Sequence, residues 1–429
     1  MWREARRWLH RLINRSVDIR FGCATRGPSA ANLKCQTDEQ RYGLKITRIL
    51  EKAVPLKSNV SNAVINFSTH TVSLVALVTD QIRNGKPVVG LSFNSIGRYA
   101  QSGIIAQRMA PRLLAAKPET LLQDNGQISA EKVLACAMQN EKPGGHGDRA
   151  HAASALELAV WDLNAKLNDE PVSALIARHF GYKNYSPKVS VYAAGGYYYP
   201  GEQAGRLESE LSGYRDLGFD RFKMKIGGAA LAEDMQRIER ALTIAGAGKN
   251  LAVDANGRFS LEQAIAYGDA MQGYNLLWYE EAGDPLDFEL NAALAKEYNG
   301  ALATGENLFS RQDVKNLALF GGARKNLDIF QMDPGLCYGV TEYAKMVGEL
   351  ESRGFDRSFC YPHSGQLLGL HVVAGLGLGG CEVYPGIFQP MGGFGDATVI
   401  EQGIVKISEA AGFGFEEKSN LMAEFATLA

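Results

Sequence analysis

The stretch RFKMKIGG, residues 221–228, places two lysines two positions apart among apolar side chains. Side chains alternate between the two faces of a strand, so Lys223 and Lys225 share one face and their apolar neighbours share the other. Two surface lysines whose stems lie along a sheet would be the ordinary interpretation. That interpretation fits poorly here. The apolar face of the strand must be covered by helices, so the face that carries the two lysines is left to point into the interior. Such a strand is expected in a barrel with a polar interior.

The pattern around this stretch also indicates a barrel. From SPKVSVYAAGG (186–196) onward, short apolar runs alternate with helical segments. This βα repeat spans roughly two hundred residues, the size of a (β/α)8 barrel, so we assign residues 186–400 to a modified TIM barrel. An open doubly wound sheet would carry a phosphate loop after its first strand. The runs are FKMKIG, LAVDANG, LLWYEEAG, ALATGEN, IFQMDPG, FCYPHSG and CEVYPG.

One glycine-rich stretch imitates a dinucleotide-binding motif. GLGLGG, residues 375–380, matches GxGxxG. The dinucleotide version follows a strand and opens a helix. This stretch follows a predicted helix and leads into a predicted strand, so we interpret it as a helix exit.

The residues before the barrel predict an α+β capping domain over 43–185. Three segments within 43–105 alternate apolar and polar residues, as the strands of an antiparallel meander do. Residues 105–182 have apolar positions at helical spacing. Strands followed by helices in one block are typical of an α+β unit. We expect residues 401–429 to return to this cap.

Residues 1–42 differ from the rest, because they are arginine-rich and poor in acids. An amphipathic targeting peptide has that composition. We favour the alternative of an upstream extension, disordered or read from a non-native start.

Bulk composition bounds the function classes. The net charge of −2 and the pI near 6.4 give no reason to expect nucleic acid or a membrane surface as a partner. No apolar run reaches the length of a membrane span. The six cysteines form no CxxC pair, which predicts neither a zinc site nor a redox motif. Scattered thiols suit a reducing compartment, so a cytoplasmic protein is expected.

Three carboxylates end three successive apolar runs. Asp254, Glu280 and Glu306 are spaced 26 residues apart, one βα unit each. In a parallel barrel they would lie on adjacent strands at the C-terminal rim, where barrel enzymes keep their chemistry. Any one of them could be a helix N-cap. Three crowded together repel one another unless a cation lies between them, and oxygen-only ligands favour Mg2+ over zinc.

Further ionisable residues continue the series on both sides. Lys223 and Lys225 lie one strand before Asp254, and a lysine beside another cation has a lowered pKa and becomes a usable base. Asp333 lies one unit beyond Glu306, and His363 one unit beyond that. An Asp can hold the tautomer of a neighbouring His and raise its pKa.

A lysine on one side, a metal in the middle and a His/Asp pair opposite suit proton abstraction next to a carboxylate. Glu382, which ends the next run, could donate a hydrogen bond if protonated. Protonation of a β-hydroxyl then gives loss of water, and return of a proton to the same carbon gives racemisation.

Together these residues resemble the enolase superfamily, in its mandelate racemase/muconate lactonizing branch, over about residues 43–429. The resemblance extends to the tartrate-dehydrating members of this branch. It rests on SNAVINFS, FNSIGRYAQ, NEKPGGHGDRA, VYAAGGYYYPG, KMKIGG, AVDANGRF, WYEEAGDPLD, ATGENLFS and GLGLGGCEVYP.

The resemblance implies dehydration of D-tartrate to oxaloacetate, with one Mg2+ per subunit held by the three carboxylates. Lys225 would abstract the α-proton, Lys223 would tune it, and His363, oriented by Asp333, would protonate the departing hydroxyl. The substrate, a small hydroxy-dicarboxylate, would be bound with the help of Ser61, Asn62, Asn256 and Glu382. A homo-oligomer is implied as well.

Two residues depart from the family pattern beside the acid. The chain has PHSGQL where PHGGHQ is expected, which brings in Ser364 and Gln366. A dehydratase of another acid sugar or diacid, and a racemase or epimerase, therefore stay open. A barrel that only binds a carboxylate is disfavoured, since a binder needs no base and acid on opposite faces.

Overall fold

A computed structural model describes residues 43–199, 205–363 and 365–428 of the chain. The predicted extension over 1–42 and Ser364 lie outside the described residues. None of the helices described is long and apolar enough to cross a membrane.

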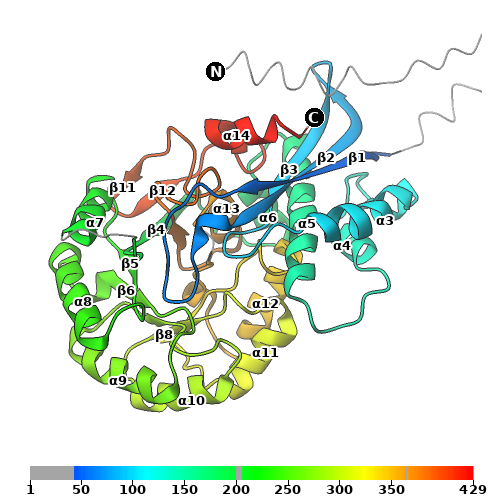
Figure 1. Cartoon of the computed structure of the whole chain (residues 1–429). Coiled ribbons are helices and arrows are strands. Elements are labelled where there is room, and N and C mark those ends of the chain that lie inside the picture. The colour runs from blue at the N-terminus through cyan, green and yellow to red at the C-terminus, as the bar shows by residue number, and fades with distance from the viewer. Residues whose placement is uncertain (1–42, 200–204, 364, 429) are drawn as a thin grey trace, which may run out of the picture.

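A three-stranded antiparallel sheet opens the cap, in the order β1-β2-β3 (Figure 1). A two-residue turn joins the second and third strands at Asn84 and Gly85, whose φ angles of 51° and 73° suit the left-handed positions of a tight hairpin. The strands are β1 (Ile46–Pro55), β2 (Thr71–Arg83) and β3 (Lys86–Phe93).

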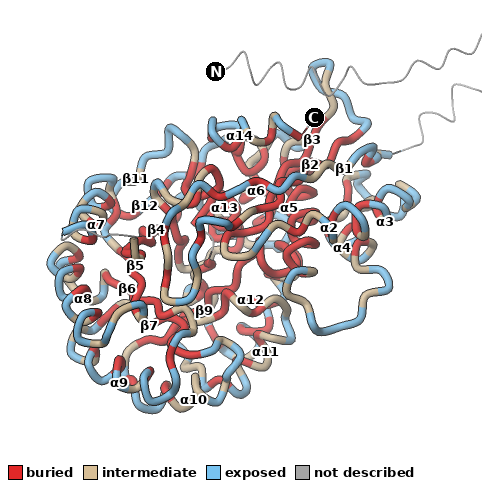
Figure 2. Tube along the Cα trace, in the orientation of Figure 1, coloured by how far each residue is buried: buried red, intermediate tan, exposed pale blue. Residues whose placement is uncertain are grey.

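Helices follow the sheet, as the sequence predicts for the cap. The longest, α5 (Gly147–Leu167), is buried along most of its length between the cap sheet and the barrel (Figure 2). It lies so close to β3 that a Cβ on Gly90 would approach the carbonyl oxygen of Ala159 to 2.1 Å, so glycine is required there. The others are α2 (Ser102–Ile104), a π-helical turn (Ile105–Met109), α3 (Ala110–Ala115), α4 (Ala130–Ala137) and α6 (Val172–His179).

Parallel strands form the barrel. Strands β4 to β9 pair in chain order, and β10 pairs back onto β4. Between β9 and β10, the segment 360–363 completes the ring: Tyr361 N donates to Phe330 O (2.9 Å) and Gly379 N to Cys360 O (3.0 Å). The strands are β4 (Lys188–Gly195), β5 (Phe222–Lys225), β6 (Leu251–Asp254), β7 (Tyr279–Glu280), β8 (Leu302–Thr304), β9 (Ile329–Phe330) and β10 (Cys381–Val383).

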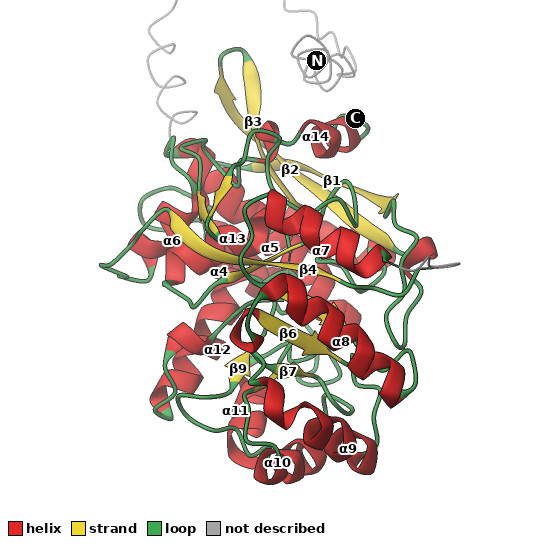
Figure 3. Ribbon diagram, turned by 90° about the vertical axis from the view of Figure 1, so that its left-hand side faces the viewer, coloured by secondary structure: helices red, strands yellow, loops and turns green. Residues whose placement is uncertain are grey.

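A helix follows each strand position up to the segment 360–363, and these helices surround the barrel (Figure 3). The predicted barrel with an α+β cap is thereby confirmed. GLGLGG is confirmed as a helix exit, because the last barrel helix, α13, ends at Leu376 and Gly377 adopts a φ of 65°. The helices are α7 (Arg206–Asp216), α8 (Leu231–Ala245), α9 (Leu261–Met271), α10 (Phe288–Glu297), α11 (Arg311–Phe320), α12 (Val340–Ser352) and α13 (Leu367–Leu376).

The C-terminal segment belongs to both units. Its first part is a hairpin of β11 (Ile400–Glu401) and β12 (Ile404–Lys406), and β12 pairs antiparallel with β4 of the barrel. Contacts with the cap begin near Gly412, whose carbonyl accepts a hydrogen bond from Val172 N (2.9 Å). The following helix α14 (Ser419–Phe425) lies near the cap sheet (Figure 1).

The core is continuous from the cap into the outer layer of the barrel. The apolar residues of the β5 strand and its exit, Phe222, Met224 and Ile226, belong to this core, which confirms that they face the helices. A separate apolar cluster includes residues two positions before the strand-end acids. It is formed by Tyr192, Ala252, Trp278, Ala301, Ala303 and Ile329. By alternation these residues and the two lysines occupy the barrel interior.

Candidate active site

The two lysines of β5 are buried inside the barrel. Lys225 is directly opposite Asp254 in the β5/β6 register and donates a hydrogen bond to its Oδ2. Lys223 Nζ lies 2.7 Å from Glu280 Oε1 and 2.8 Å from Glu382 Oε1. Each ammonium is therefore paired with carboxylates from neighbouring strands.

These pairs correct two predictions about charge. Burial lowers the pKa of Lys225, but the acidic groups around it, Asp254 first among them, together raise that pKa above its ordinary value. Lys223 does lower the pKa of Lys225, as predicted, but more weakly than Asp254 raises it, so the predicted net lowering is wrong. Burial raises the pKa of Glu382, but the cations around it, Lys223 first among them, together lower that pKa, so Glu382 is ionised and not the predicted donor.

The strand-end carboxylates crowd one another. Asp254 and Glu280 are neighbours in the β6/β7 register, and Glu306 follows β8. Burial, and then the charge of Asp254, raise the pKa of Glu280 to about 7. With both lysines inserted among these acids, no group of three or more His, Cys, Asp or Glu side chains in the described part of the chain is arranged to hold a metal.

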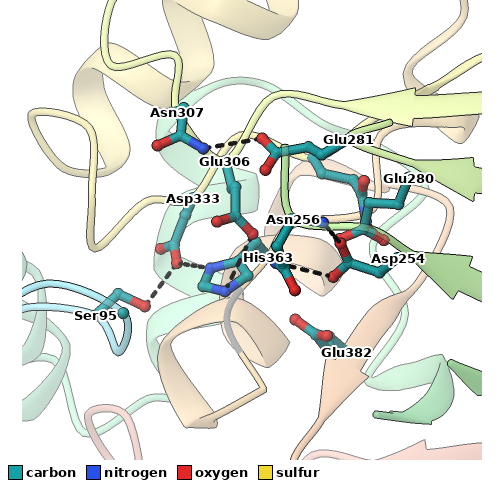
Figure 4. Close-up of polar contacts among 12 residues, drawn as sticks. Ser95, Asp254, Asn256, Glu280, Glu281, Glu306, Asn307, Asp333, His363 and Glu382 are labelled. Atoms are coloured by element: carbon teal, nitrogen blue, oxygen red, sulfur yellow. Dashed lines mark hydrogen bonds and ion pairs between the residues drawn. The ribbon is translucent and has the colours of Figure 1, made fainter. Parts of the chain in front are cut away.

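The donor set nevertheless fits a hard cation. Asn256 donates from its backbone N to Asp254 Oδ1 (2.8 Å), while its own Oδ1 is buried and lacks a hydrogen-bond partner among the residues described. An orphaned amide oxygen beside three carboxylates is an oxygen-only set, which Mg2+ prefers. Asn256 thus lies at the carboxylate cluster, as Figure 4 shows.

A fourth acid at this cluster was missed by the sequence reasoning. Glu281 is buried, and burial followed by the charges of Glu306 and Asp254 raises its pKa well above the ordinary value. Its φ of 38° is left-handed, and Asn307 Nδ2 donates to its Oε1 (2.9 Å). The doubled acid in WYEEAG was the available signal.

The acid pair lies on the opposite side of the site (Figure 4). His363 Nδ1 donates to Asp333 Oδ2 (2.9 Å). Burial lowers the pKa of His363, but the carboxylate of Glu306 and the hydrogen bond to Asp333 outweigh burial and raise it to about 9. The imidazole is therefore held in its protonated form near neutral pH.

Tyr384 connects the acid pair to the lysine side, and the sequence reasoning did not select it. Its Oη lies 3.0 Å from His363 Nε2 and donates to Glu382 Oε2 (3.0 Å). Glu382 is in turn paired with Lys223. A hydrogen-bonded path thus runs across the barrel from β5 to the segment 360–363.

The predicted substrate-binding residues Ser61 and Asn62 of the cap hydrogen-bond to backbone groups of the protein. Ser61 exchanges backbone hydrogen bonds with Tyr198 of the barrel, and Asn62 Oδ1 accepts from Val64 N (2.8 Å) and Ile65 N (2.6 Å). Their substrate-binding role stays a prediction.

Two other cap residues reach the site, and neither was predicted. Ser95 Oγ donates to Asp333 Oδ2 (2.6 Å), and Arg98 donates to Asn307 Oδ1. Both lie within FNSIGRYAQ, which follows β3.

The chain belongs to the mandelate racemase/muconate lactonizing enzyme family of the enolase superfamily. The family model described as "Mandelate racemase / muconate lactonizing enzyme, N-terminal domain" matches residues 51–177. The model described as "Enolase C-terminal domain-like" matches residues 206–420, half of the chain. The first corresponds to most of the cap and the second to the barrel from α7 onward.

Relatives of known activity include acid-sugar dehydratases and cycloisomerases. The chain is 28% identical over 367 residues to the L-talarate/galactarate dehydratase of Salmonella typhimurium, which covers 84% of this chain and 86% of that protein. It is 26% identical over 281 residues to the arabinonate dehydratase of Saccharolobus solfataricus, which covers 63% of this chain and 71% of that one.

Solved structures share the fold. The structure of the Salmonella dehydratase superposes with a TM-score of 0.69 at 24% identity, over 95% of this chain and 97% of that chain. A racemase from Streptomyces coelicolor, whose structure contains bound magnesium, superposes with a TM-score of 0.70 at 22% identity, over 88% and 99% of the two chains.

Proposed function

We propose that this protein is a magnesium-dependent dehydratase of hydroxy acids, with D-tartrate, converted to oxaloacetate, as the substrate. The observation that carries the proposal is that Lys225 on β5 and the His363/Asp333 pair beyond β9 lie at opposite ends of the strand order that carries the carboxylate cluster. A base and an acid that face each other across a carboxylate-binding site are the two groups that elimination of water requires.

The reaction balances with these two groups alone. Lys225 Nζ, in its neutral form, takes the proton from the carbon next to the substrate carboxylate. The electron pair of that C–H bond moves onto the substrate carboxylate and gives an enediolate. Collapse of the enediolate then forms the carbon–carbon double bond as the C–O bond of the β-hydroxyl breaks. His363 Nε2 gives its proton to the departing oxygen, so water leaves, and the resulting enol tautomerises to the keto acid.

Asp254, Glu280 and Glu306 would hold Mg2+, and the amide oxygen of Asn256 lies beside them. Bound there, the ion supplies positive charge that stabilises the negative charge developing on the substrate carboxylate. Because Lys225 is paired with Asp254, withdrawal of that carboxylate from the lysine would release the ammonium to lose its proton. This connects the raised pKa of Lys225 to its role as a base.

Two observations favour a dehydratase over a racemase, and the sequence resemblance favours tartrate as the substrate. The relatives named above remove water from polyhydroxy acids. The acid has a pKa of about 9 and is protonated before the reaction begins. Tartrate itself is proposed on the resemblance to the tartrate-dehydrating members of the family, which VYAAGGYYYPG and GLGLGGCEVYP help to carry.

The test is an assay of the purified protein with Mg2+ against D-, L- and meso-tartrate, galactarate, L-talarate and arabinonate, following keto-acid formation. We expect turnover of D-tartrate, abolished in Lys225→Ala and His363→Asn. Lys249→Ala, a change at an exposed lysine beyond α8, serves as the control and should retain full activity.

Each other result has a definite meaning. Turnover of an acid sugar but not of tartrate would contradict the substrate and keep the dehydratase. Deuterium incorporation from solvent without keto acid, for every substrate, would indicate a racemase instead. Binding of tartrate that survives Lys225→Ala, without any exchange or turnover in the wild type, would favour a carboxylate-binding protein.

A further inference from the structure

The cap contributes a side chain to the acid pair of the barrel. Ser95, on the loop after β3, is fully buried, and its Oγ lies 2.6 Å from Asp333 Oδ2 (Figure 4). The two residues are 238 positions apart in the chain. The contact is reinforced by the backbone, because Ser95 N donates to Gly335 O (3.1 Å).

The directions of the surrounding hydrogen bonds are all determined. An ionised carboxylate only accepts, so the single hydroxyl proton of Ser95 must point at Asp333. The lone pairs of Ser95 Oγ are then free to accept, and Gln366 Nε2 donates to them (2.9 Å). Gln366 is fully buried and is one of the residues that depart from the family pattern. The chain of donors therefore runs from Gln366 to Ser95 to Asp333.

This series of hydrogen bonds fixes the orientation of the Asp333 carboxylate. Its Oδ1 accepts from Gly335 N (2.6 Å), and its Oδ2 accepts from both Ser95 and His363. Without the serine hydroxyl, Oδ2 would keep His363 alone as a partner in a site closed to water. The carboxylate could then turn, and with it the imidazole whose Nδ1–H it holds.

The base side of the site has a different composition. Lys225 is paired with Asp254, and Asp254 accepts from Asn256, all within the barrel. The acid side is thus completed by the cap, and the base side is built from the barrel.

We propose that Ser95, held by Gln366, is a positioning residue for the acid step, so that docking of the cap controls loss of water and not removal of the α-proton. The inference rests on the proposed dehydration. It assigns Gln366 a function as the support of the serine, in place of contact with the substrate.

The test compares Ser95→Ala with Ser154→Ala. Ser154 is an equally buried serine of the cap at the same junction, and its Oγ donates to Gly335 O (2.8 Å) without touching Asp333. Two rates are measured for each variant with Mg2+ and the substrate found above: formation of keto acid, and exchange of the α-proton with solvent deuterium.

Loss of an orienting partner typically costs 10- to 100-fold in activity. We therefore expect Ser95→Ala to lower kcat for water loss by about 10- to 100-fold while exchange and KM stay within about threefold of the wild type. Ser154→Ala should lower both rates equally or neither. Gln366→Met should act like Ser95→Ala more weakly, and the double variant should be no worse than Ser95→Ala, because both act through one carboxylate.

The inference is overturned if Ser95→Ala lowers exchange and water loss by the same factor, or if it matches Ser154→Ala. A measurement without turnover separates this failure from failure of the proposed function. In protein labelled with 15N-histidine, the His363 signals, identified by their loss in His363→Asn, report the hydrogen bond that Nδ1–H makes to Asp333. They should change in Ser95→Ala and not in Ser154→Ala. Unchanged signals in Ser95→Ala would overturn the inference even if no substrate is found.

Discussion

Tyr384 shows how much of the site depends on one hydroxyl group. It donates to Glu382 and accepts from the protonated Nε2 of His363, the atom proposed to protonate the leaving oxygen. A hydrogen bond to a charged group contributes about 1.5–3 kcal/mol. We expect Tyr384→Phe to lower kcat for dehydration by about 10- to 100-fold.

The matched control is Tyr343→Phe, which removes the hydroxyl of an equally buried tyrosine on α12 that has no hydrogen-bond partner among the described residues. Steady-state kinetics of both variants, with folding checked by circular dichroism, decide the question. Equal activities would show that His363 does not need this partner.

The carboxylate cluster predicts how magnesium and protons compete. Glu280 has a pKa of about 7, raised by burial and by Asp254, so protonation relieves part of its repulsion and a bound cation would relieve it as well. Stabilisation by Mg2+ should therefore be larger at pH 8 than at pH 6. At a concentration one hundred times Kd it amounts to about 2.7 kcal/mol.

Thermal unfolding with and without Mg2+ measures this stabilisation. Asp254→Asn should abolish most of the increase in Tm, and Asp269→Asn, on the exposed surface of α9, should leave it intact. An increase that is independent of pH and of Asp254 would place the ion elsewhere.

Spacing located the strand-end residues and could not locate their partners. Asp254, Glu280, Glu306, Asp333 and His363 each follow an apolar run, so a count of βα units brings them to one rim. Ser95 and Tyr384 can be recognised as site residues only from contacts in the folded structure, because no local sequence pattern marks them. The raised pKa of Lys225 was missed for the same reason, because the sequence does not show how closely Asp254 approaches it.

At the scale of elements, α5 and α12 form one part of the junction of cap and barrel. Glu157, buried on α5, accepts hydrogen bonds from Val340 N and Thr341 N (both 2.9 Å) at the start of α12. It also accepts from Trp161 Nε1 (2.8 Å). A carboxylate from one domain thus caps a helix of the other, where the first backbone N–H groups lack partners within the helix.

Glu157→Ala should destabilise the protein by about 2–4 kcal/mol, since it removes a helix cap and leaves buried donors unpaired. Urea unfolding measures the change. Glu131→Ala is the control, because Glu131 also connects the cap to α12, through Lys345 at 3.5 Å, but from the exposed surface. It should cost less than about 0.5 kcal/mol. A similar small cost for both variants would show that the cap of α12 is dispensable.

The sequence predicted the kinds of elements better than their extents. The βα alternation gave every barrel strand, yet β7 and β9 contain only two residues each and the segment 360–363 pairs through a single bridge. The boundary at residue 400 placed the β11–β12 hairpin outside the barrel. Its pairing with β4 is a tertiary contact, which an alternation pattern of five residues does not specify.

At the scale of the whole molecule, two buried histidines connect its parts and are held neutral. His151 lies on α5 of the cap, and burial, followed by the charges of Arg98 and His146, lowers its pKa to about 3. His371 lies on α13 of the barrel, where its Nδ1 accepts from Ser173 N of the cap (3.3 Å) and its ring packs against Phe413 of the C-terminal segment. Burial lowers its pKa to about 3 as well.

These values predict acid sensitivity of the whole fold. In the unfolded chain both histidines have pKa values near the ordinary 6.5. Between about pH 6.5 and pH 3 the unfolded state therefore binds more protons than the folded state, so the free energy of unfolding is complete above pH 6.5 and falls as the pH decreases through this window. Each histidine contributes up to about 1.4 kcal/mol per pH unit.

Urea unfolding of the wild type at intervals from pH 7.5 to 4.5 measures the slope. His371→Gln removes one titrating group, so its slope should be shallower by up to that amount, whatever its stability at pH 7.5. Burial also lowers the pKa of His179 at the end of α6, but this residue is more exposed than His371, so His179→Gln should keep more of the slope than His371→Gln. A slope in His371→Gln equal to that of the wild type would mean that this histidine is already protonated in the folded protein, and that the junction of cap, barrel and C-terminal segment accepts a charge.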